Sequence, residues 1–193
     1  KVWFQLDDTP YFYWLIPDNN RKAVVGLIAE EGADIRTLLN NFLEKNQFQP
    51  QSYQSGKAAL YDKRLEIQFR VGDLDVYLVG DAAGQVKVTT VGGTVTGLYG
   101  GMAAAEAILQ GSSFRKAHQN GLRELGLHLF IRNLLTKMSA SDYQRLIRDI
   151  SPAVQSLLSR YDRDAIRRHF WKLALLQPDF IPLGLKLLFK NIR

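Results

Sequence analysis

The residues best suited to chemistry in this 193-residue chain lie in one stretch, where an acidic residue stands among small ones. Asp81 follows the apolar run 76–79 and Gly80, and a carboxylate at the end of a strand can accept hydrogen bonds from the hydroxyls of a sugar or ribityl chain. Further along, Gly92 and Gly93 precede a helix-forming run. Backbone N–H groups at a helix start attract anions, and glycines let a ligand approach the main chain. The stretch predicts a site for a cofactor bearing phosphates or polyols.

Three elements are expected to position these residues. Residues 65–71 alternate apolar and polar side chains, which predicts a half-buried strand with Val71 on the inward side. A turn leads from it into a short buried strand over 75–79. Residues 93–109 favour a helix whose surface is rich in glycine and alanine. Each mid-helix glycine costs about 1 kcal/mol relative to alanine, so such a helix needs a closely approaching backbone or ligand.

The N-terminal part has the pattern of a small sheet covered by a helix. Residues 2–6, which include two aromatic residues, read as a strand, and residues 11–29 read as a β-hairpin. In the first hairpin strand, positions 12, 14 and 16 share one face. Residues 34–45 show a helical period with Asp34 as the N-cap, and we expect this helix to pack on the sheet.

From Gly111 onward the pattern is all-helical. Ser141, Ser151 and Asp162 are the expected N-caps of three of the helices. The last helix carries Lys186, Lys190 and Arg193 on one face, as a basic amphipathic helix on a membrane surface would, although packing on its neighbours is the default expectation. The expected helices are 114–137, 142–150, 153–161, 163–176 and 179–192.

Composition and charge narrow the functional classes. The chain has no cysteine, which removes disulfides, thiolate metal sites and cysteine nucleophiles. The net charge of +6 comes from the C-terminal part, since residues 111–193 carry 15 Lys and Arg against 6 Asp and Glu. Such a bias suits an anionic membrane surface or a phosphorylated lipid, or simply solvated helix faces; we expect no nucleic-acid partner. The three histidines are expected on helix surfaces or in the core, with no metal site.

The run from Val76 to Ile108 resembles the second flavin-binding motif of FAD-dependent oxidoreductases of the hydroxybenzoate-hydroxylase type, and within them the geranylgeranyl reductase family. The core from Gly80 to Gly84 is shared widely in that type. The extension Gln85-Val86-Lys87-x-Thr89-Thr90-x-Gly92-Gly93 narrows the match to the isoprenoid reductases. Val88 and Val91 stand where closer members tend to have Pro and Gly.

A second motif of that family is an aromatic-x-Trp-x-aromatic-Pro segment followed by Gly-x-Gly. This chain has Phe12 to Pro17 and then Gly26. It departs from the pattern with Phe12 in place of Tyr, Ile16 in place of Phe, and Ile28 in place of the second glycine. The resemblance implies that Phe12 and Trp14, with Pro17 and Gly26, contribute to a substrate-binding wall for an isoprenoid.

The resemblance also implies the cofactor and the reaction. The cofactor would be FAD, whose reduced form supplies a hydride to an alkene carbon; the electron donor, such as NADPH or ferredoxin, and the catalytic and proton-donating residues are not assigned. Lys87 would pair with a phosphate, polarise flavin O2 or reach solvent. The implied cofactor-binding residues are Gly80, Asp81, Ala82, Ala83, Gly84, Gly92, Gly93, Thr94 and Val95.

The expected fold is α+β, as the C-terminal portion of such an oxidoreductase, with a substrate-domain portion (1–72), the end of the FAD domain (73–111) and a helical domain (112–193). The Gly-x-Gly-x-x-Gly turn that holds the ADP half of FAD is absent from these residues, so we expect FAD to bind weakly or not at all to this chain alone. Alternatives are a flavin monooxygenase or halogenase of the same fold, or a non-catalytic lipid-binding or membrane-docking module. We expect a polyprenyl or other small-molecule substrate and a cytoplasmic location, with possible peripheral membrane contact through the basic helices.

Overall fold

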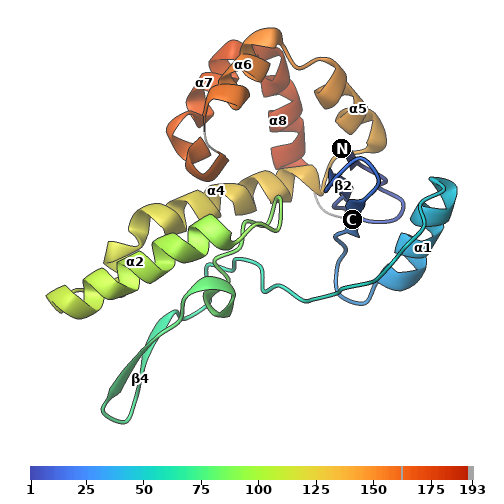
Figure 1. The fold of residues 1–193 in the computed structure, drawn as a ribbon. Coiled ribbons are helices and arrows are strands. Elements are labelled where there is room, and N and C mark those ends of the chain that lie inside the picture. Colours follow the sequence, from blue (N-terminus) through green and yellow to red (C-terminus); the bar gives the residue numbers. More distant parts are fainter. Residues whose placement is uncertain (162, 191–193) are drawn as a thin grey trace. The chain divides into compact units, whose positions relative to one another are not determined.

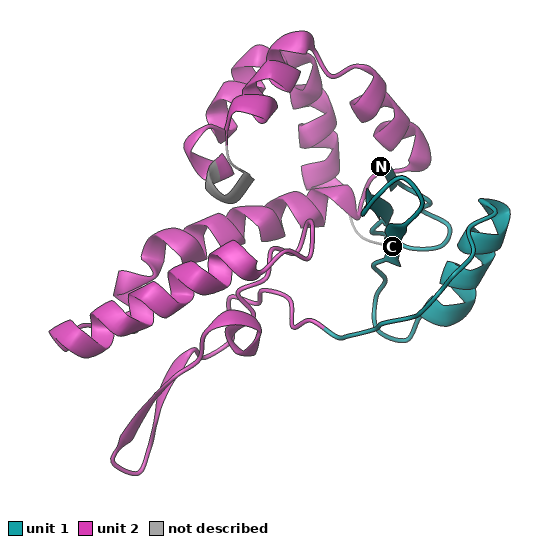
Figure 2. Ribbon diagram, in the orientation of Figure 1, with its two compact units in different colours: residues 1–57 teal, residues 58–193 magenta. Residues whose placement is uncertain are grey.

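The computed structural model of the chain is a mixed α and β structure that divides into two compact units, residues 1–57 and residues 58–193 (Figure 2). The structure describes residues 1–161 and 163–190. Both units contain a small antiparallel sheet and helix, and most of the helices lie in the second unit (Figure 1). The α+β class is therefore as predicted. The expected boundaries at 72 and 111 stay predictions.

The first unit is built on a three-stranded antiparallel sheet in the order β1-β2-β3. Its strands are β1 (Val2–Trp3), β2 (Tyr13–Pro17) and β3 (Ala23–Leu27), so the predicted hairpin is confirmed and the first strand is shorter than expected. In the register, Trp14 stands opposite Gly26 on β3 and opposite Val2 on β1. These pairs place Trp14 at the middle of the sheet.

One face of this sheet is covered by α1 (Ile35–Lys45). Asp34 is the N-cap, as predicted, and accepts a hydrogen bond from the Thr37 N–H at 3.1 Å. Tyr13 is fully buried and stacks on Phe42 of α1, with ring centroids 4.2 Å apart. Burial, together with a hydrogen bond to Asp8, raises the pKa of the Tyr13 hydroxyl well above its usual range. Tyr13 therefore belongs to the core, and Phe12 and Trp14 belong to the opposite face.

The second unit begins with a two-stranded hairpin, β4 (Gln68–Val71) and β5 (Leu74–Tyr77), which extends away from the helices of that unit (Figure 1). Ile67 is buried, but Val71 is 57% and Leu74 is 71% exposed. The predicted burial of Val71 is therefore wrong. The strand predicted over 75–79 is present as β5, but it ends at Tyr77 and none of its residues is fully buried. Two strands alone have no second layer to cover the tip of the hairpin, and alternation in the sequence does not reveal that.

The core of the second unit forms around α2 (Thr94–Gln110), which was predicted over nearly the same residues. A 3₁₀ turn, η1 (Gly80–Ala83), and the short helix α3 (Phe114–Ala117) contact it. Alanines let these elements approach α2 closely, and the aromatic ring of Phe114 fills the remaining space. The buried cluster consists of Ile67, Ala83, Ala103, Ala104, Ala107 and Phe114.

The helix predicted over 114–137 is divided at His118 into α3 and α4 (Gln119–Leu135). His118 is buried, and its ring stacks on Phe114 with centroids 5.9 Å apart. A Cβ atom on Gly121 would overlap the imidazole, so the glycine makes room for the ring. Burial lowers the pKa of His118 and keeps the neutral form in the core.

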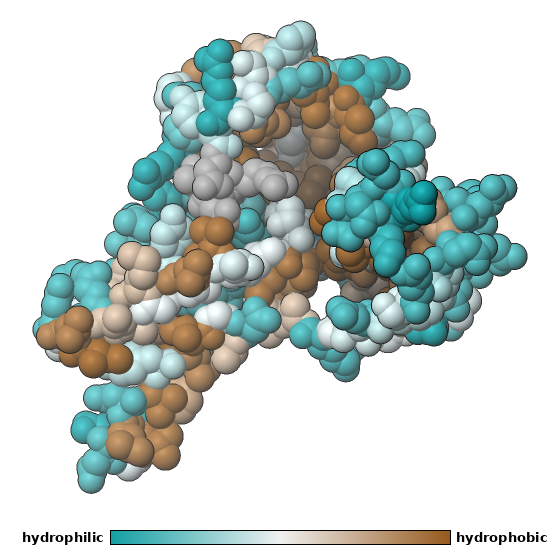
Figure 3. Space-filling model, viewed as in Figure 1, coloured by the Kyte–Doolittle hydropathy of each residue, from teal (hydrophilic) through white to brown (hydrophobic). Residues whose placement is uncertain are grey.

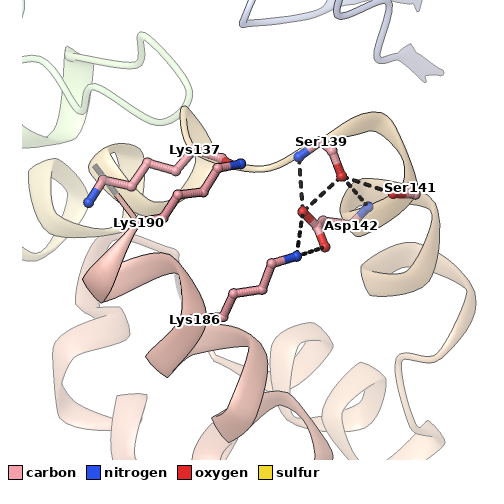
Figure 4. Close-up of polar contacts among 6 residues, drawn as sticks. All are labelled: Lys137, Ser139, Ser141, Asp142, Lys186 and Lys190. Atoms are coloured by element: carbon pink, nitrogen blue, oxygen red, sulfur yellow. Dashed lines mark hydrogen bonds and ion pairs between the residues drawn. The ribbon is translucent and has the colours of Figure 1, made fainter. Parts of the chain in front are cut away.

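The helix α5 (Ala140–Arg148) begins two residues earlier than predicted, because Ser139 and not Ser141 is its N-cap. Ser139 and Asp142 form a capping box: the Asp142 N–H donates to Ser139 Oγ at 3.2 Å, and the Ser139 N–H donates to Asp142 Oδ2 at 3.0 Å. Lys186 also binds Asp142 at 3.1 Å (Figure 4). This tertiary ion pair favours the earlier start. The next helix, α6 (Pro152–Arg160), is capped by Ser151 as predicted.

The remaining helices are shorter than predicted. Residues 163–176 form η2 (Arg163–Arg168) and α7 (Phe170–Leu176), separated at His169, and residues 178–189 form η3 (Pro178–Phe180) and α8 (Ile181–Phe189). Asp162 and Arg193 lie outside the described residues. In the part of the chain that the structure describes, no helix has both the length and the apolar character needed to cross a membrane.

The basic stripe predicted on the last helix is not a free cationic face. Lys186 binds the buried carboxylate of Asp142, and the Lys190 ammonium donates to the Lys137 carbonyl at 2.7 Å (Figure 4). Both lysines therefore hold α8 to the α4–α5 region. These contacts agree with the default expectation that the last helix packs on its neighbours.

Candidate cofactor site

The acidic turn lies where β5 leads into η1 and then into a left-handed glycine. Gly84 has a φ of 57°, which other residues rarely adopt, and its N–H donates to the Asp81 carbonyl at 3.0 Å. A Cβ on Gly84 would also lie only 3.0 Å from the Leu60 carbonyl oxygen. These constraints close the turn tightly and place the Asp81 side chain on its exposed side.

Gln85 fixes the shape of this turn from inside. Its side chain is fully buried, and its Oε1 accepts a hydrogen bond from the Gly80 N–H at 2.7 Å. Its own backbone N–H donates to the Gly80 carbonyl at 2.9 Å. A Cβ on Gly100 of α2 would overlap the Gln85 amide, so that glycine provides the space. A structural role for Gln85 was not predicted from the sequence. The signal that could have indicated it is a long polar residue between a glycine-containing turn and an apolar residue.

The loop between the turn and the helix is closed by a bridge between Lys87 and Gly92, in which the Lys87 N–H donates to the Gly92 carbonyl at 3.1 Å. Val91 in this loop has a φ of 52°. A β-branched residue is strained in this left-handed region of φ/ψ space, which glycine adopts without strain. The motifs that this loop resembles tend to have glycine at this position, and glycine would adopt the φ of Val91 without strain.

The start of α2 lies directly against the turn. Gly93 is the N-cap and has no side chain to cap the first-turn N–H groups, while Thr96 Oγ1 donates to the carbonyl oxygens of Gln85 and Gly93. A Cβ on Gly97 would lie 3.2 Å from the Gly80 Cα. Gly97 therefore allows the backbone of the turn to pack closely against α2. With glycine at the N-cap, the N-terminus of α2, with its positive partial charge, is open on one side.

An open groove of about 780 Å³ lies along this junction. Main-chain surface forms much of it, because four of the lining residues are glycines, and a Cβ on Gly80 or Gly101 would meet only open space. Apolar side chains from the loop and from α2 line the rest. The glycines are Gly80, Gly93, Gly97 and Gly101, and the larger apolar residues are Val86, Val91, Leu98 and Met102.

Asp81 is the acidic residue of the groove. Its Oδ1 points toward Gly93, at 3.3 Å from where a Cβ on that glycine would lie. Among the described residues, no hydrogen-bond donor or cation pairs with this carboxylate. The groove therefore combines an unpaired acceptor, an uncapped helix start and exposed main chain.

The predicted cofactor residues are only partly brought together. Gly80, Asp81, Gly93 and Thr94 line the groove. The others lie beside it: Ala82 is exposed, Ala83 and Gly84 are buried in the core, Val95 is half-buried, and Gly92 faces the Lys87 side chain.

No family model, curated protein or solved structure matches this chain. The class of ligand is therefore inferred from the residues of the groove. They suit the polyol and phosphate portion of a dinucleotide, because the carboxylate can accept hydroxyl hydrogen bonds and the α2 start favours an anion. The glycines let such a group reach the main chain.

Of the predicted substrate residues, Phe12, Trp14 and Gly26 lie on the sheet face of the first unit that is opposite α1. The Trp14 indole lies across Gly26, where any Cβ would overlap the ring, and the ring of Phe12 meets that of Phe4 edge-on at 6.0 Å. Pro17 ends β2 and is exposed. Ile16 and Val24, which face each other in the register, are also exposed. This face is an aromatic and aliphatic surface without a covering layer in its unit.

A buried polar row on α4 was missed by the sequence analysis. Glu124, His128 and Arg132 are four residues apart and all buried, and the His128 Nε2 lies 4.0 Å from Glu124 Oε1. Thr89 of the 85–91 loop contacts His128 Nδ1 at 2.7 Å. The four-residue spacing was visible in the sequence. The row ties the loop to α4, and in the described part of the chain no group of three or more His, Asp or Glu side chains has the arrangement of a metal site.

Proposed function

We propose that this chain is the C-terminal part of an FAD-dependent oxidoreductase similar to geranylgeranyl reductases, which reduces isoprenoid double bonds. The observation that carries the proposal is the groove in which Asp81, the uncapped start of α2 and four glycines meet. The motif from Gly80 to Gly93 supplies the resemblance. Its strand–turn–loop–helix order is the one that a dinucleotide-binding segment needs.

The chain's own residues would hold the cofactor in two ways. Asp81 would accept hydrogen bonds from ribityl or nearby hydroxyls, since its carboxylate has no other partner among the described residues. The N–H groups of Thr94 and its neighbours in the first turn of α2 would donate to phosphate oxygens or to the flavin's pyrimidine edge. When bound, reduced FAD would supply the hydride.

Rigidity of the turn is the second requirement for orienting a cofactor. The buried Gln85 amide and the Thr96 hydroxyl lock the turn and the loop to α2, and neither of these two residues lines the groove. The binding groups therefore need little reorganisation when a ligand arrives. Apolar walls at Val86 and Leu98 would exclude water from one side.

The substrate class rests on the open face of the first unit. Phe12 and Trp14, with Ile16 and Val24, form an apolar surface that suits a polyprenyl chain, for which the attraction is hydrophobic burial and not hydrogen bonding. Gly26 keeps that surface flat beneath the indole. A polyprenyl diphosphate, a prenylated pigment precursor or a prenyl glycerolipid would present such a chain.

Flavin titration of this chain tests the cofactor part of the proposal. We expect weak, saturable quenching of flavin fluorescence by the purified chain, and Asp81→Ala should weaken that affinity about tenfold, because a hydrogen bond to a charged group is lost. Asp73→Ala is the matched control, since it removes the same charge from an exposed turn of the β4–β5 hairpin. Equal losses from both substitutions would contradict the proposed site. So would tight, stoichiometric flavin on the purified chain that Asp81→Ala leaves unchanged.

A further inference from the structure

The helix α7 is unusual in this structure because none of its residues is buried. Its sequence is Phe-Trp-Lys-Leu-Ala-Leu-Leu, and most of its large apolar side chains are exposed: Leu173 is half-buried, but Trp171 is 58% and Leu175 is 70% exposed. These two residues are four apart and share one face of the helix. A nearly all-apolar helix normally lies in a core, so its exposure here requires a partner surface.

Cations surround this apolar surface. Arg167 and Arg168 precede α7 and are exposed, and Lys172 lies within it. The Lys172 ammonium is 5.7 Å from the centre of the Trp171 ring and 5.3 Å from that of Tyr161. Among the described residues, no acidic side chain forms an ion pair with any of these three cations. The positive charge is thus available to an external partner, unlike that of Lys186 and Lys190.

We propose that this α7 surface, formed by Arg167, Arg168, Trp171, Lys172, Leu175 and Leu176, docks the protein onto an anionic lipid bilayer. Leucine and tryptophan side chains would enter the interfacial region of the membrane, which the amphipathic indole ring favours. The arginines and the lysine would lie among the anionic headgroups. The docking does not depend on flavin binding.

Charge favours a bilayer over a second copy of this chain as the occupant. In a symmetric dimer the same surface would meet itself, and three cations would face three cations. An anionic membrane neutralises them instead. Hydrophobic side chains also gather over α8 (Figure 3), and Leu185 and Leu188 of that helix are exposed, but Lys186 and Lys190 are bound within the chain and offer no free charge to a membrane. The proposal therefore assigns α7 as the anchor.

Vesicle flotation of the full chain tests this proposal. We expect binding to vesicles of phosphatidylcholine with added phosphatidylglycerol and little binding to phosphatidylcholine alone. Each of Arg167→Gln, Arg168→Gln and Lys172→Gln should lower the partition coefficient about fivefold at low salt. Leu175→Ser should lower it about tenfold. Brominated lipid should quench the tryptophan fluorescence of the wild-type chain but much less that of Trp171→Phe.

Matched controls distinguish membrane binding through the α7 surface from nonspecific binding to vesicles. Lys116→Gln removes an exposed cation from α3, and Leu109→Ser removes an exposed leucine from α2; both should leave partitioning unchanged. Losses as large as those at α7 would overturn the proposal. So would equal binding to neutral vesicles, or sedimentation showing that Leu175→Ser dissolves a dimer while vesicle binding stays at the wild-type level.

Discussion

Two adjacent glycines in α2 should respond oppositely to the same substitution. Gly100→Ala places a Cβ where the Gln85 amide lies, whereas Gly101→Ala places one in open space. Both substitutions gain about 1 kcal/mol of helix propensity. Only the first forces Gln85 to move, although its side chain is fully buried and accepts the Gly80 N–H at 2.7 Å.

The expected magnitudes follow from that contact. Displacing the amide leaves the Gly80 N–H without its acceptor and overpacks the turn, at a cost of roughly 2–4 kcal/mol. After the propensity gain, Gly100→Ala should lower the free energy of unfolding by about 1–3 kcal/mol. Gly101→Ala should raise it by about 1 kcal/mol. Urea unfolding followed by far-UV circular dichroism measures both.

A double substitution sharpens the test. Gln85→Ala removes the amide that the new methyl group would strike, so Gly100→Ala should cost less in that background than in the wild-type chain. Equal stability changes for the two glycine variants would refute the reasoning. The same holds if the effect of Gly100→Ala is unchanged when Gln85 is absent.

Three further predictions concern other contacts. Gly26→Ala should lower the stability of the first unit by about 1–3 kcal/mol, because the new methyl group overlaps the Trp14 indole, and Trp14→Leu should remove most of that loss in thermal unfolding. Val91→Gly should raise the free energy of unfolding by about 0.5–1 kcal/mol by relieving left-handed strain at a φ of 52°, and a loss on urea unfolding would contradict this. The Ser139 backbone N–H, more than any other group, lowers the pKa of Asp142 from 3.8 to about 2. The ionised Asp142 carboxylate therefore stabilises the fold fully above pH 3.8, and this stabilisation is lost as the pH falls toward 2. In acid unfolding, Asp142→Asn should make the free energy of unfolding less dependent on pH between these two values.

Local patterns predicted most elements, and the failures came from contacts between distant residues. The hairpin over 11–29, α1 with its Asp34 cap and α2 all follow from period and capping. Ser139 and Ser141 each have a capping-box partner three residues on, and the Lys186 ammonium bound to Asp142 favours the first. No local pattern contains that information.

Exposure was the other quantity that local pattern could not supply. Alternation marks which side chains of a strand share a face but not whether another layer covers that face, so Val71 was expected inside and lies outside. In the site, glycine spacing predicted close packing of α2. It did not predict that the partner at Gly100 would be the buried amide of Gln85.

The most direct test of the central claim is an anaerobic turnover measurement on the longer protein of which we propose this chain is the C-terminal part. With reduced FAD and a polyprenyl substrate, the product should gain the mass of one dihydrogen per reduced double bond, and Asp81→Ala should slow the reaction and weaken flavin binding. Oxygen consumption with an aromatic substrate, without saturation of a prenyl chain, would contradict the account.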